Sequence, residues 1–358
     1  MIKILLKIIP YKLFRRFGYP KLLPMNLTVG LTYRCNSRCK TCHIWQKKDK
    51  GQELTLGEWD KIFKNLSKSI VFLTFTGGEP FLKKEIVKIC QSAYHHCRPR
   101  IITIPTNGLL TKTVVEKVSQ IAKNSPQTQV IVNLSVDGLG DQDDQIRGVK
   151  GHYQKVMATY RQLKRLRNQN LIVGFHTVIS KFNVKEFPQI VNTLLAFKPD
   201  SYVTEMAEQR VELGTQRSEI SPSLEEYQKA VDYLIALTKK SQFKGVAKIT
   251  QAFRQEYYRL TKKILEQKKQ IIPCYAGWAS AQIAPNGDVW GCCLKASVYG
   301  NLRKVNYQFS KIWFSPKADE LRKSTAQGQC YCPMANASYT NMLMDFKTLL
   351  KVGLNFFG

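Results

Sequence analysis

Short hydrophobic runs alternate with segments of helical periodicity through the first 206 residues. Six runs rich in Val, Ile, Leu, Phe and Thr have the length of buried β-strands. These runs occupy residues 25–32, 71–75, 100–105, 130–136, 171–179 and 201–206. Predicted helices follow the first five, at about 55–67 and 83–97, from about 112, at about 151–168, and from 183. Alternation of this kind predicts a parallel sheet with right-handed crossovers. We expect an α/β fold, a partial TIM-like barrel of six β/α units.

Polar or glycine-rich segments follow four of the predicted strands. A cysteine-rich loop follows the first, TGGEP (76–80) the second, TNG (106–108) the third and SVDG (135–138) the fourth. The carboxyl ends of parallel strands meet at one edge of the sheet, where such folds bind their ligands. The sequence therefore predicts a binding site at that edge.

The pattern changes after residue 220. Two helical stretches, near 223–240 and 250–268, precede a loop-rich segment at 271–335 that holds five of the ten cysteines. The expected parts are a basic amphipathic N-terminal segment (1–24), the partial barrel (25–220), a helical connector (221–270), a small loop-rich domain with five cysteines (271–335) and an amphipathic tail (336–358).

The charge is strongly positive, with 55 Lys and Arg against 26 Asp and Glu, a formal net charge of +29. Such an excess indicates an anionic partner: a phospholipid surface, a nucleic acid or an acidic substrate. Residues 1–50 hold twelve basic residues and one acid, Asp49.

Both ends of the chain combine apolar and basic residues. In segment 1–24, apolar residues follow helical spacing, and Pro10 is expected to open a second, turn-rich part. Two interpretations remain open: a basic amphipathic helix that lies on anionic lipid, or a helix packed on the domain with a solvated basic face. The tail KTLLKVGLNFFG has the same character. The apolar runs are too short to span a bilayer.

The cysteines are grouped in short clusters, which favours metal or cluster binding in a reducing compartment over disulfides. We expect a cytoplasmic protein, with peripheral association at the inner face of the membrane left open. Cys90 and Cys97 fall in a predicted helix and are expected to fill the core.

Cys35, Cys39 and Cys42 lie on the loop after the first strand, with no fourth thiol nearby. A structural zinc site needs four ligands, and His43 adjoins Cys42 too closely to supply the last one readily. Three thiolates can instead hold a 4Fe–4S cluster and leave one iron without a protein ligand.

The Cys-x3-Cys-x2-Cys loop, followed by GGEP after the second strand, closely resembles radical S-adenosylmethionine (SAM) enzymes over about residues 25–335. The resemblance implies a cluster on Cys35, Cys39 and Cys42 whose open iron binds SAM. It also implies reductive cleavage of SAM to a 5′-deoxyadenosyl radical, which takes hydrogen from an unactivated C–H bond. An electron donor such as flavodoxin or ferredoxin is implied as a partner.

The resemblance also assigns SAM contacts, position by position. They are Gly77, Gly78 and Glu79 for the SAM ammonium, Asn107, Ser135 and Asp137 in the next two loops, and Arg147 for the SAM carboxylate. One position departs from the family: Thr41 stands where an aromatic residue near adenine is common.

A second cysteine group resembles the SPASM domain or its shortened form, twitch. Asn286-Gly287 predicts a hairpin turn that presents a cysteine on the returning strand. The resemblance implies one auxiliary 4Fe–4S cluster, with Cys293 as the alternative to one of the last two ligands. The expected ligands are Cys274, Cys292, Cys330 and Cys332. A structural zinc site on four cysteines is the alternative.

The substrate is left open by the sequence. Enzymes with this cap act on ribosomal peptides, sulfatase side chains and aminosugars, while the basic ends suggest a membrane-associated, lipid-linked or anionic substrate. The alternatives are a ribosomal-peptide maturase, an RNA-modifying enzyme and a non-catalytic iron–sulfur or zinc scaffold. Candidates for the substrate pocket are Tyr202, Glu205 and Arg210, with His176 as a further candidate or a core histidine.

Overall fold

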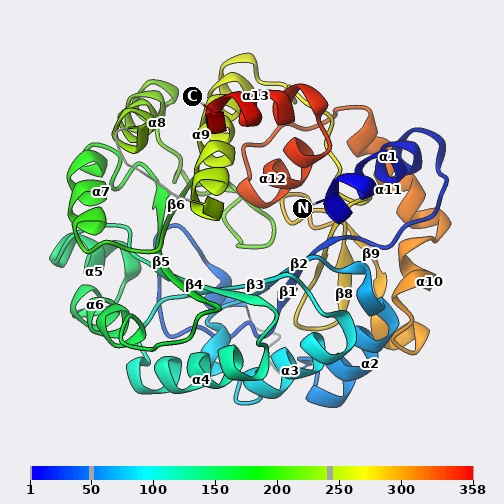
Figure 1. The fold of residues 1–358 in the computed structure, drawn as a ribbon, viewed down its shortest axis with the longest axis horizontal. Helices are drawn as coiled ribbons and strands as arrows, with labels where there is room; N and C mark the ends of the chain where they lie inside the picture. Colours follow the sequence, from blue (N-terminus) through cyan, green and yellow to red (C-terminus); the bar gives the residue numbers. More distant parts are fainter. Residues whose placement is uncertain (1, 48–51, 240–244, 358) are drawn as a thin grey trace.

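The computed structural model describes residues 2–47, 52–239 and 245–357. Six parallel strands form its centre in the spatial order β6-β5-β4-β3-β2-β1 (Figure 1). They are β1 (Asn26–Gly30), β2 (Phe72–Thr76), β3 (Ile101–Thr106), β4 (Gln129–Ser135), β5 (Leu171–Ile179) and β6 (Ser201–Met206). Sequential neighbours pair in register, so the strand ends line up at one edge. The predicted open, partial barrel is confirmed.

Helices that follow the strands cover the outside of this sheet (Figure 1). They are α2 (Leu56–Leu66), α3 (Ile86–Cys97), α4 (Thr111–Asn124), α5 (Asp141–Arg147), α6 (His152–Leu163) and α7 (Phe187–Ala196). Helix α2 begins with a capping box, in which Thr55 and Glu58 bond each other's backbone N–H. Its buried side chains, at i, i+3, i+4 and i+7 spacing, are Trp59, Ile62, Phe63 and Leu66.

The C-terminal cysteine-rich segment extends the same sheet. Strand β7 (Ser280–Ile283) pairs in parallel with β1, and β8 (Asp288–Trp290) and β9 (Val298–Asn301) continue the sheet in antiparallel fashion. The predicted hairpin joins β7 to β8, with Gly287 at φ +90°. The pairing of β7 with β1 was not anticipated from the sequence.

Helices α8 (Leu224–Lys239), α9 (Gly245–Gln267), α12 (Ala335–Leu343) and α13 (Phe346–Phe357) lie across the open side between β6 and β1 (Figure 1). Helices α10 (Phe309–Trp313) and α11 (Pro316–Ala326) lie beside β9 instead. Short 3-10 turns lie at Ile44–Gln46, Ser67–Ser69, Pro80–Leu82 and Leu302–Val305. Asn26 at the start of β1 donates to Asn336 and Thr340, at 2.8 and 2.9 Å, and so fixes α12 against the sheet.

The N-terminal segment forms one helix, α1 (Ile2–Phe17), that runs through Pro10. The expected break at Pro10 is therefore wrong. Proline removes the hydrogen bond to the carbonyl four residues earlier, that of Leu6. Leu6 is 70% exposed, so water can replace the missing donor. No helix among the described residues is long and apolar enough to cross a membrane.

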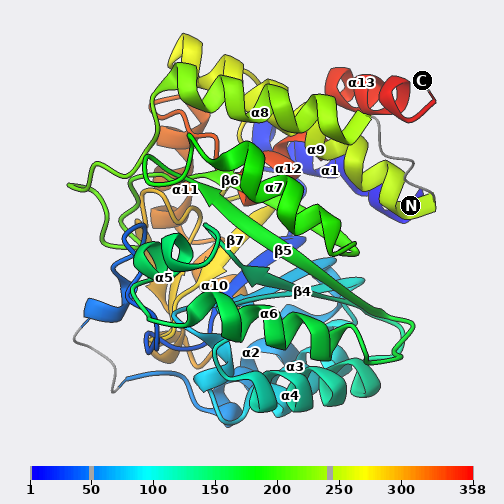
Figure 2. The same cartoon turned by 90° about the vertical axis from the view of Figure 1, so that its left-hand side faces the viewer.

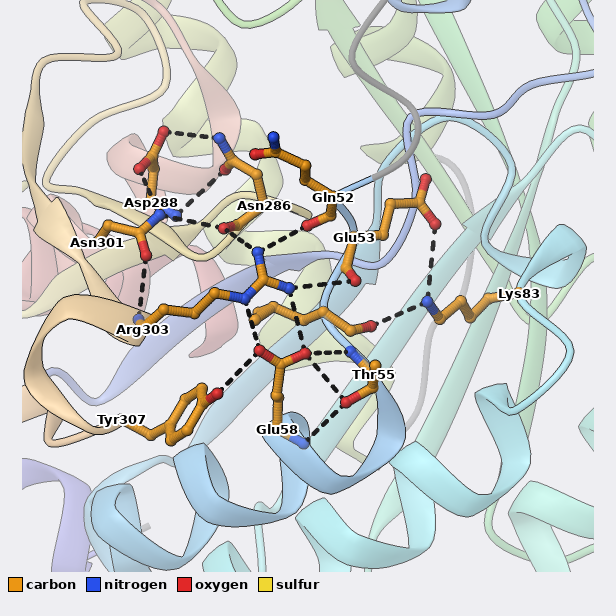
Figure 3. Close-up of polar contacts among 11 residues, drawn as sticks. Gln52, Glu53, Thr55, Glu58, Lys83, Asn286, Asp288, Asn301, Arg303 and Tyr307 are labelled. Atoms are coloured by element: carbon orange, nitrogen blue, oxygen red, sulfur yellow. Dashed lines mark hydrogen bonds and ion pairs between the residues drawn. The ribbon is translucent and has the colours of Figure 1, made fainter.

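Arg303, just after β9, joins the C-terminal segment to the start of the barrel (Figure 3). Its guanidinium donates to Glu58 Oε1 at 2.6 Å and to the carbonyl of Gln52 at 2.9 Å. Glu53, next in the chain, accepts from Thr32 Oγ1 at 2.6 Å and lies 3.6 Å from Lys83 Nζ. These contacts fix the C-terminal segment relative to the cysteine loop after β1.

Candidate active site

The first cysteine loop is held by backbone hydrogen bonds on three sides. From the segment after β2, the N–H of Gly78 donates to Thr32 O and that of Glu79 to Arg34 O, at 2.7 and 2.8 Å. Arg38 and Lys40 of the loop donate to the carbonyls at the end of α5. On the third side His43 donates its N–H to Leu213 O, and its Nδ1 lies 3.2 Å from Gly214 O. These hydrogen bonds fix the path of the loop backbone.

Gly77 and Gly78 lie directly against this loop. A Cβ at Gly77, which has φ +130°, would stand 2.3 Å from the Thr32 carbonyl oxygen. A Cβ at Gly78 would stand 2.2 Å from Arg34 O and 3.0 Å from Cys35 Cβ. Both glycines therefore permit the close approach of the cysteine loop itself.

We expect Gly78→Ala to displace Cys35 and to reduce the iron bound at the first cysteine group, because backbone atoms of Arg34 must move away from the added methyl. The measurement is iron content and the visible spectrum after anaerobic reconstitution. Gly57→Ala is the control, because a Cβ there meets no atom within 4 Å. Full cluster occupancy in Gly78→Ala would contradict this account of the glycine.

The three thiols of the first group lie close enough to interact electrostatically, Cys35 with Cys39, and Cys42 with both. Burial raises the pKa of Cys35 to about 11 and that of Cys42 to about 12, and it also raises that of Cys39. Cys39 Sγ lies 3.7 Å from Arg147 Nη1, which donates to it. A bound metal centre would deprotonate such thiols.

Glu79 is 1% exposed and binds the end of β3. Its Oε1 accepts from Thr106 Oγ1 at 2.8 Å and its Oε2 from the N–H of Asn107, also at 2.8 Å. Burial raises the pKa of Glu79 to about 7, although these hydrogen bonds oppose the rise. Asn107 in turn donates from Nδ2 to Asn36 Oδ1 at 2.7 Å, within the cysteine loop. Glu79 and Asn107 thus tie three strand ends together.

Asp137 and Arg147 form a buried ion pair beneath Cys39. Arg147 Nη2 lies 3.0 Å from Asp137 Oδ2, and Asp137 Oδ1 accepts from the N–H of Val178 at 2.8 Å. Arg147 Nε is buried and has no hydrogen-bond partner among the described residues. A buried guanidinium with a free N–H beside a cysteine of the loop is suited to bind an anion.

Two other predicted contacts lie nearby. Ser135 ends β4, is half-buried, and stands opposite His176 in the sheet register. Thr41, the departure from the family pattern, is 7% exposed and lies between Cys39 and Cys42 in the cysteine loop. Because Ser135 ends β4, both residues lie at the edge of the sheet where the strands end.

The second cysteine group is also assembled. Cys274 interacts electrostatically with Cys292 and Cys330, and Cys332 interacts with Cys292 and Cys274. Burial raises the pKa of Cys274 to about 11. Cys293 interacts electrostatically with Cys292 and Cys332 as well, and its Sγ lies 2.8 Å from Met334 Sδ. The four predicted thiols therefore lie together, with Cys293 beside two of them.

Cys90 and Cys97 lie in α3 and are 0% and 1% exposed. Cys97 Sγ donates to Phe63 O at 3.4 Å. The prediction that both fill the core is confirmed.

A cluster of largely buried polar side chains lies between the two cysteine groups. His176 Nε2 is 3.7 Å from Glu205 Oε1, and Arg210 Nη2 is 3.4 Å from Glu205 Oε2. His176 also interacts electrostatically with Asp137 and Arg147, and Arg210 with Cys293. Burial alone would raise the pKa of Glu205, but Arg210 and His176 keep it below the usual value. The side chains of His176, Glu205 and Arg210 keep 13–19% exposure, so they are accessible to a small group.

Sequence reasoning missed Glu208, Asp143 and His152. Glu208 Oε2 lies 3.9 Å from Arg210 Nη2. Burial raises the pKa of Glu208 to about 7. Asp143 Oδ1 accepts from the N–H of Asp137 at 2.7 Å, and its Oδ2 lies 2.5 Å from His152 Nδ1. The dense run of acids at 141–144 was the signal for this support of Asp137.

Two family models match the chain. The radical SAM superfamily model matches residues 29–194, and an iron–sulfur cluster-binding domain, SPASM, matches residues 274–333. The chain therefore contains a radical SAM domain and, C-terminal to it, a SPASM domain.

Curated relatives are similar to the chain over part of their length. The pre-heme d1 synthase of Dinoroseobacter shibae is 28% identical over 45% of this chain and 38% of its own length. The subtilosin biosynthesis protein AlbA of Bacillus subtilis is 23% identical over 85% of this chain and 62% of its own. The chain thus spans less than two thirds of either relative.

SuiB of Streptococcus suis shares the fold. Its structure bound to S-adenosylmethionine has a TM-score of 0.65 at 14% identity and covers 86% of this chain and 70% of SuiB. Its structure bound to the precursor peptide SuiA has a TM-score of 0.64 at 14% identity, with 88% and 70% coverage.

The family implies a SAM-binding 4Fe–4S cluster and auxiliary iron–sulfur binding in the SPASM domain. The residues present fit both, since three neighbouring thiols lie beside a guanidinium with a free N–H, and four more thiols lie together. Within the described part of the chain, no three His, Cys, Asp or Glu side chains are arranged to hold a single metal ion. A 4Fe–4S cluster binds its cysteines through different irons.

Proposed function

We propose that this chain is a radical SAM enzyme that acts on a C–H bond of a peptide substrate. When bound, a 4Fe–4S cluster with one iron free of protein ligands supplies the electron for reductive cleavage of SAM to a 5′-deoxyadenosyl radical. The observation that carries the proposal is the placement of Cys35, Cys39 and Cys42 against Gly78 and Arg147 at the edge where four strands end.

The chain's own residues would hold SAM as follows. Arg147 would donate its free Nε–H to the SAM carboxylate, while Asp137 keeps the guanidinium in place. The segment Gly77–Glu79 would meet the SAM ammonium, and Asn107 and Ser135 would contact the remainder of the molecule. The Glu79 carboxylate already accepts bonds from Thr106, Phe81 and Asn107, so it also positions the segment.

The polar group of His176, Glu205, Glu208 and Arg210 supports a substrate pocket between the two cysteine groups. A buried Arg and His with partial exposure can orient a peptide carbonyl or carboxylate by charge-assisted hydrogen bonds. The names of AlbA, a bacteriocin biosynthesis protein, and of SuiB, solved with a precursor peptide, support a peptide as the substrate class. The net charge of +29 favours an acidic one.

A substrate embedded in lipid is less well supported. Helices α1 and α13 pack near the start of the strands, whereas the cysteine loop follows the end of β1 (Figure 2). The proposed location is cytoplasmic and peripheral at the membrane, and a flavodoxin or ferredoxin is the proposed electron donor.

We propose Cys274, Cys292, Cys330 and Cys332 as the ligands of one auxiliary 4Fe–4S cluster. Cys332→Ala is expected to lower iron content from about eight to about four atoms per chain or to leave a labile cluster. Cys293→Ala, the matched control, is expected to keep about eight atoms, because its thiol contacts Met334 and is not one of the four proposed ligands. Iron and sulfide content are measured in both variants. Loss of iron in Cys293→Ala but not in Cys332→Ala would make Cys293 the fourth ligand.

The function is tested by incubating anaerobically reconstituted, reduced protein with SAM and measuring 5′-deoxyadenosine. Formation of 5′-deoxyadenosine in an amount that depends on reductant is expected. A protein that holds its full complement of iron but forms no 5′-deoxyadenosine would instead support a non-catalytic iron–sulfur scaffold.

A further inference from the structure

Helix α1 is apolar on two opposite faces, and only one of them is covered. Ile8, Tyr11 and Phe14 are 2–3% exposed and pack in a cluster with Met25, Val71, Tyr275, Trp278 and Met344. On the other face Leu6, Ile9, Leu13 and Phe17 are 41–70% exposed. A surface helix usually turns polar side chains outward and buries only its apolar face. The outer apolar face of α1 has no covering partner among the described residues.

Helix α13 shows the same feature beside it. Val352 is 5% exposed and faces the protein, whereas Phe346, Leu350 and Leu354 are 50–73% exposed in an i, i+4, i+8 row. Lys12 of α1 lies 4.2 Å from the centre of the Phe346 ring and donates to Met344 O. Figure 2 shows both helices at the same end of the molecule, opposite α5.

The two rows account for most of the exposed apolar surface. Eleven large hydrophobic side chains are exposed among the described residues, and eight of them belong to these rows or to Tyr19. We call these eight the terminal-helix surface: Leu6, Ile9, Leu13, Phe17, Tyr19, Phe346, Leu350 and Leu354. Such a concentration marks a contact surface, since scattered exposure is the norm elsewhere.

Basic side chains border this surface. Arg16, Lys21, Lys347 and Lys351 are exposed, and neither α1 nor α13 contains an acidic residue. Apolar rows with a cationic border match the boundary between the headgroups and acyl chains of an anionic bilayer. A second copy of this surface would instead bring like charges together.

We propose that the terminal-helix surface docks α1 and α13 together on an anionic phospholipid bilayer. The inference refines the proposed peripheral location and is independent of SAM chemistry. The buried face of α1 contacts residues at the start of β1, β2 and β7, and Lys7 donates to Ser69 O just before β2. The cysteine loop and the SAM-binding segments lie at the other ends of the strands. Docking would therefore turn the site away from the bilayer, toward a soluble substrate and electron donor.

Flotation of the full chain with vesicles tests the proposal. We expect binding to vesicles of phosphatidylglycerol and phosphatidylcholine, weak binding to phosphatidylcholine alone, and loss of binding as salt rises. A variant with Ile9→Gln, Leu13→Gln, Leu350→Gln and Leu354→Gln should bind roughly a hundredfold more weakly. The control Leu224→Gln changes a side chain that is 39% exposed on α8 and should bind as the native chain does.

A second pair of variants tests the charges without touching the apolar rows. Lys347→Gln with Lys351→Gln should weaken binding to the anionic vesicles, whereas Lys84→Gln with Lys112→Gln, also exposed, should not. SAM cleavage should be unchanged in every variant, so a failure here is distinct from a failure of the proposed function. Unchanged flotation of the four-site variant would overturn the proposal. Failure of the native chain to bind the anionic vesicles would also overturn it. A native dimer that the four substitutions dissociate would show that the surface binds a second copy of the chain instead.

Discussion

Cys39→Ala is expected to fold and to form no detectable 5′-deoxyadenosine. Cys39 is the middle thiol of the first group, with its Sγ beside Arg147, and alanine leaves two thiols to hold the cluster. The loop itself should persist, because backbone bonds from Gly78, Glu79, Arg38 and Lys40 hold it. The measurement is 5′-deoxyadenosine formed after anaerobic reconstitution, together with the circular dichroism spectrum.

Cys90→Ala is the matched control for this variant. Its thiol is also buried but lies in α3, in the hydrophobic core. It should lose some stability, as truncation of a core side chain does, yet keep SAM cleavage. Turnover in Cys39→Ala equal to that of the native chain would reject the assignment of the first cysteine group.

Arg147→Met is expected to lower the free energy of unfolding by about 3–5 kcal/mol and to abolish SAM binding. The change leaves the Asp137 carboxylate, which is 0% exposed, buried without its counterion. It also removes the free Nε–H proposed to bind the SAM carboxylate. Denaturant unfolding measures the first effect, and calorimetric titration of the reconstituted protein with SAM measures the second.

The double variant Arg147→Met with Asp137→Asn separates the two effects. Without the carboxylate there is no unpaired charge, so much of the lost stability should return. SAM binding should not return, because the amide cannot replace the guanidinium. Recovery of SAM binding in the double variant would show that Arg147 acts only as the counterion of Asp137.

Much of the barrel was predictable because each β/α unit has a local signal. The six strands lie within a few residues of their predicted positions, and the capping box at Thr55 places the start of α2. The turn at Asn286-Gly287 likewise depends on two adjacent residues. Local signals of this kind do not depend on the rest of the chain.

What the sequence could not predict depends on distant contacts. Strand β7 has four residues, and its parallel pairing with β1 joins positions about 250 residues apart. The continuous α1 is stabilised by packing of Ile8, Tyr11 and Phe14 on distant segments, which overrides the signal of Pro10.

In the candidate site, too, local motifs were predictable and contacts between distant residues were not. The motif residues lie in the loops where the sequence places them, but the packing role of Gly77 and Gly78 depends on distant residues. Their missing side chains admit the backbone of Thr32 and Arg34, about 45 residues earlier in the chain. The support of Asp137 by Asp143 and His152 also became visible only in three dimensions.

Electron paramagnetic resonance of the reduced protein, recorded with and without SAM, tests the central claim most directly. A variant with Cys274→Ala and Cys330→Ala removes the signal of the auxiliary centre and leaves the first cysteine group to be observed. We predict a 4Fe–4S signal whose g values shift when SAM is added, because the nucleotide binds the iron that the protein leaves open. A protein that holds only zinc at Cys35, Cys39 and Cys42, or a cluster signal that SAM leaves unchanged, would contradict the account.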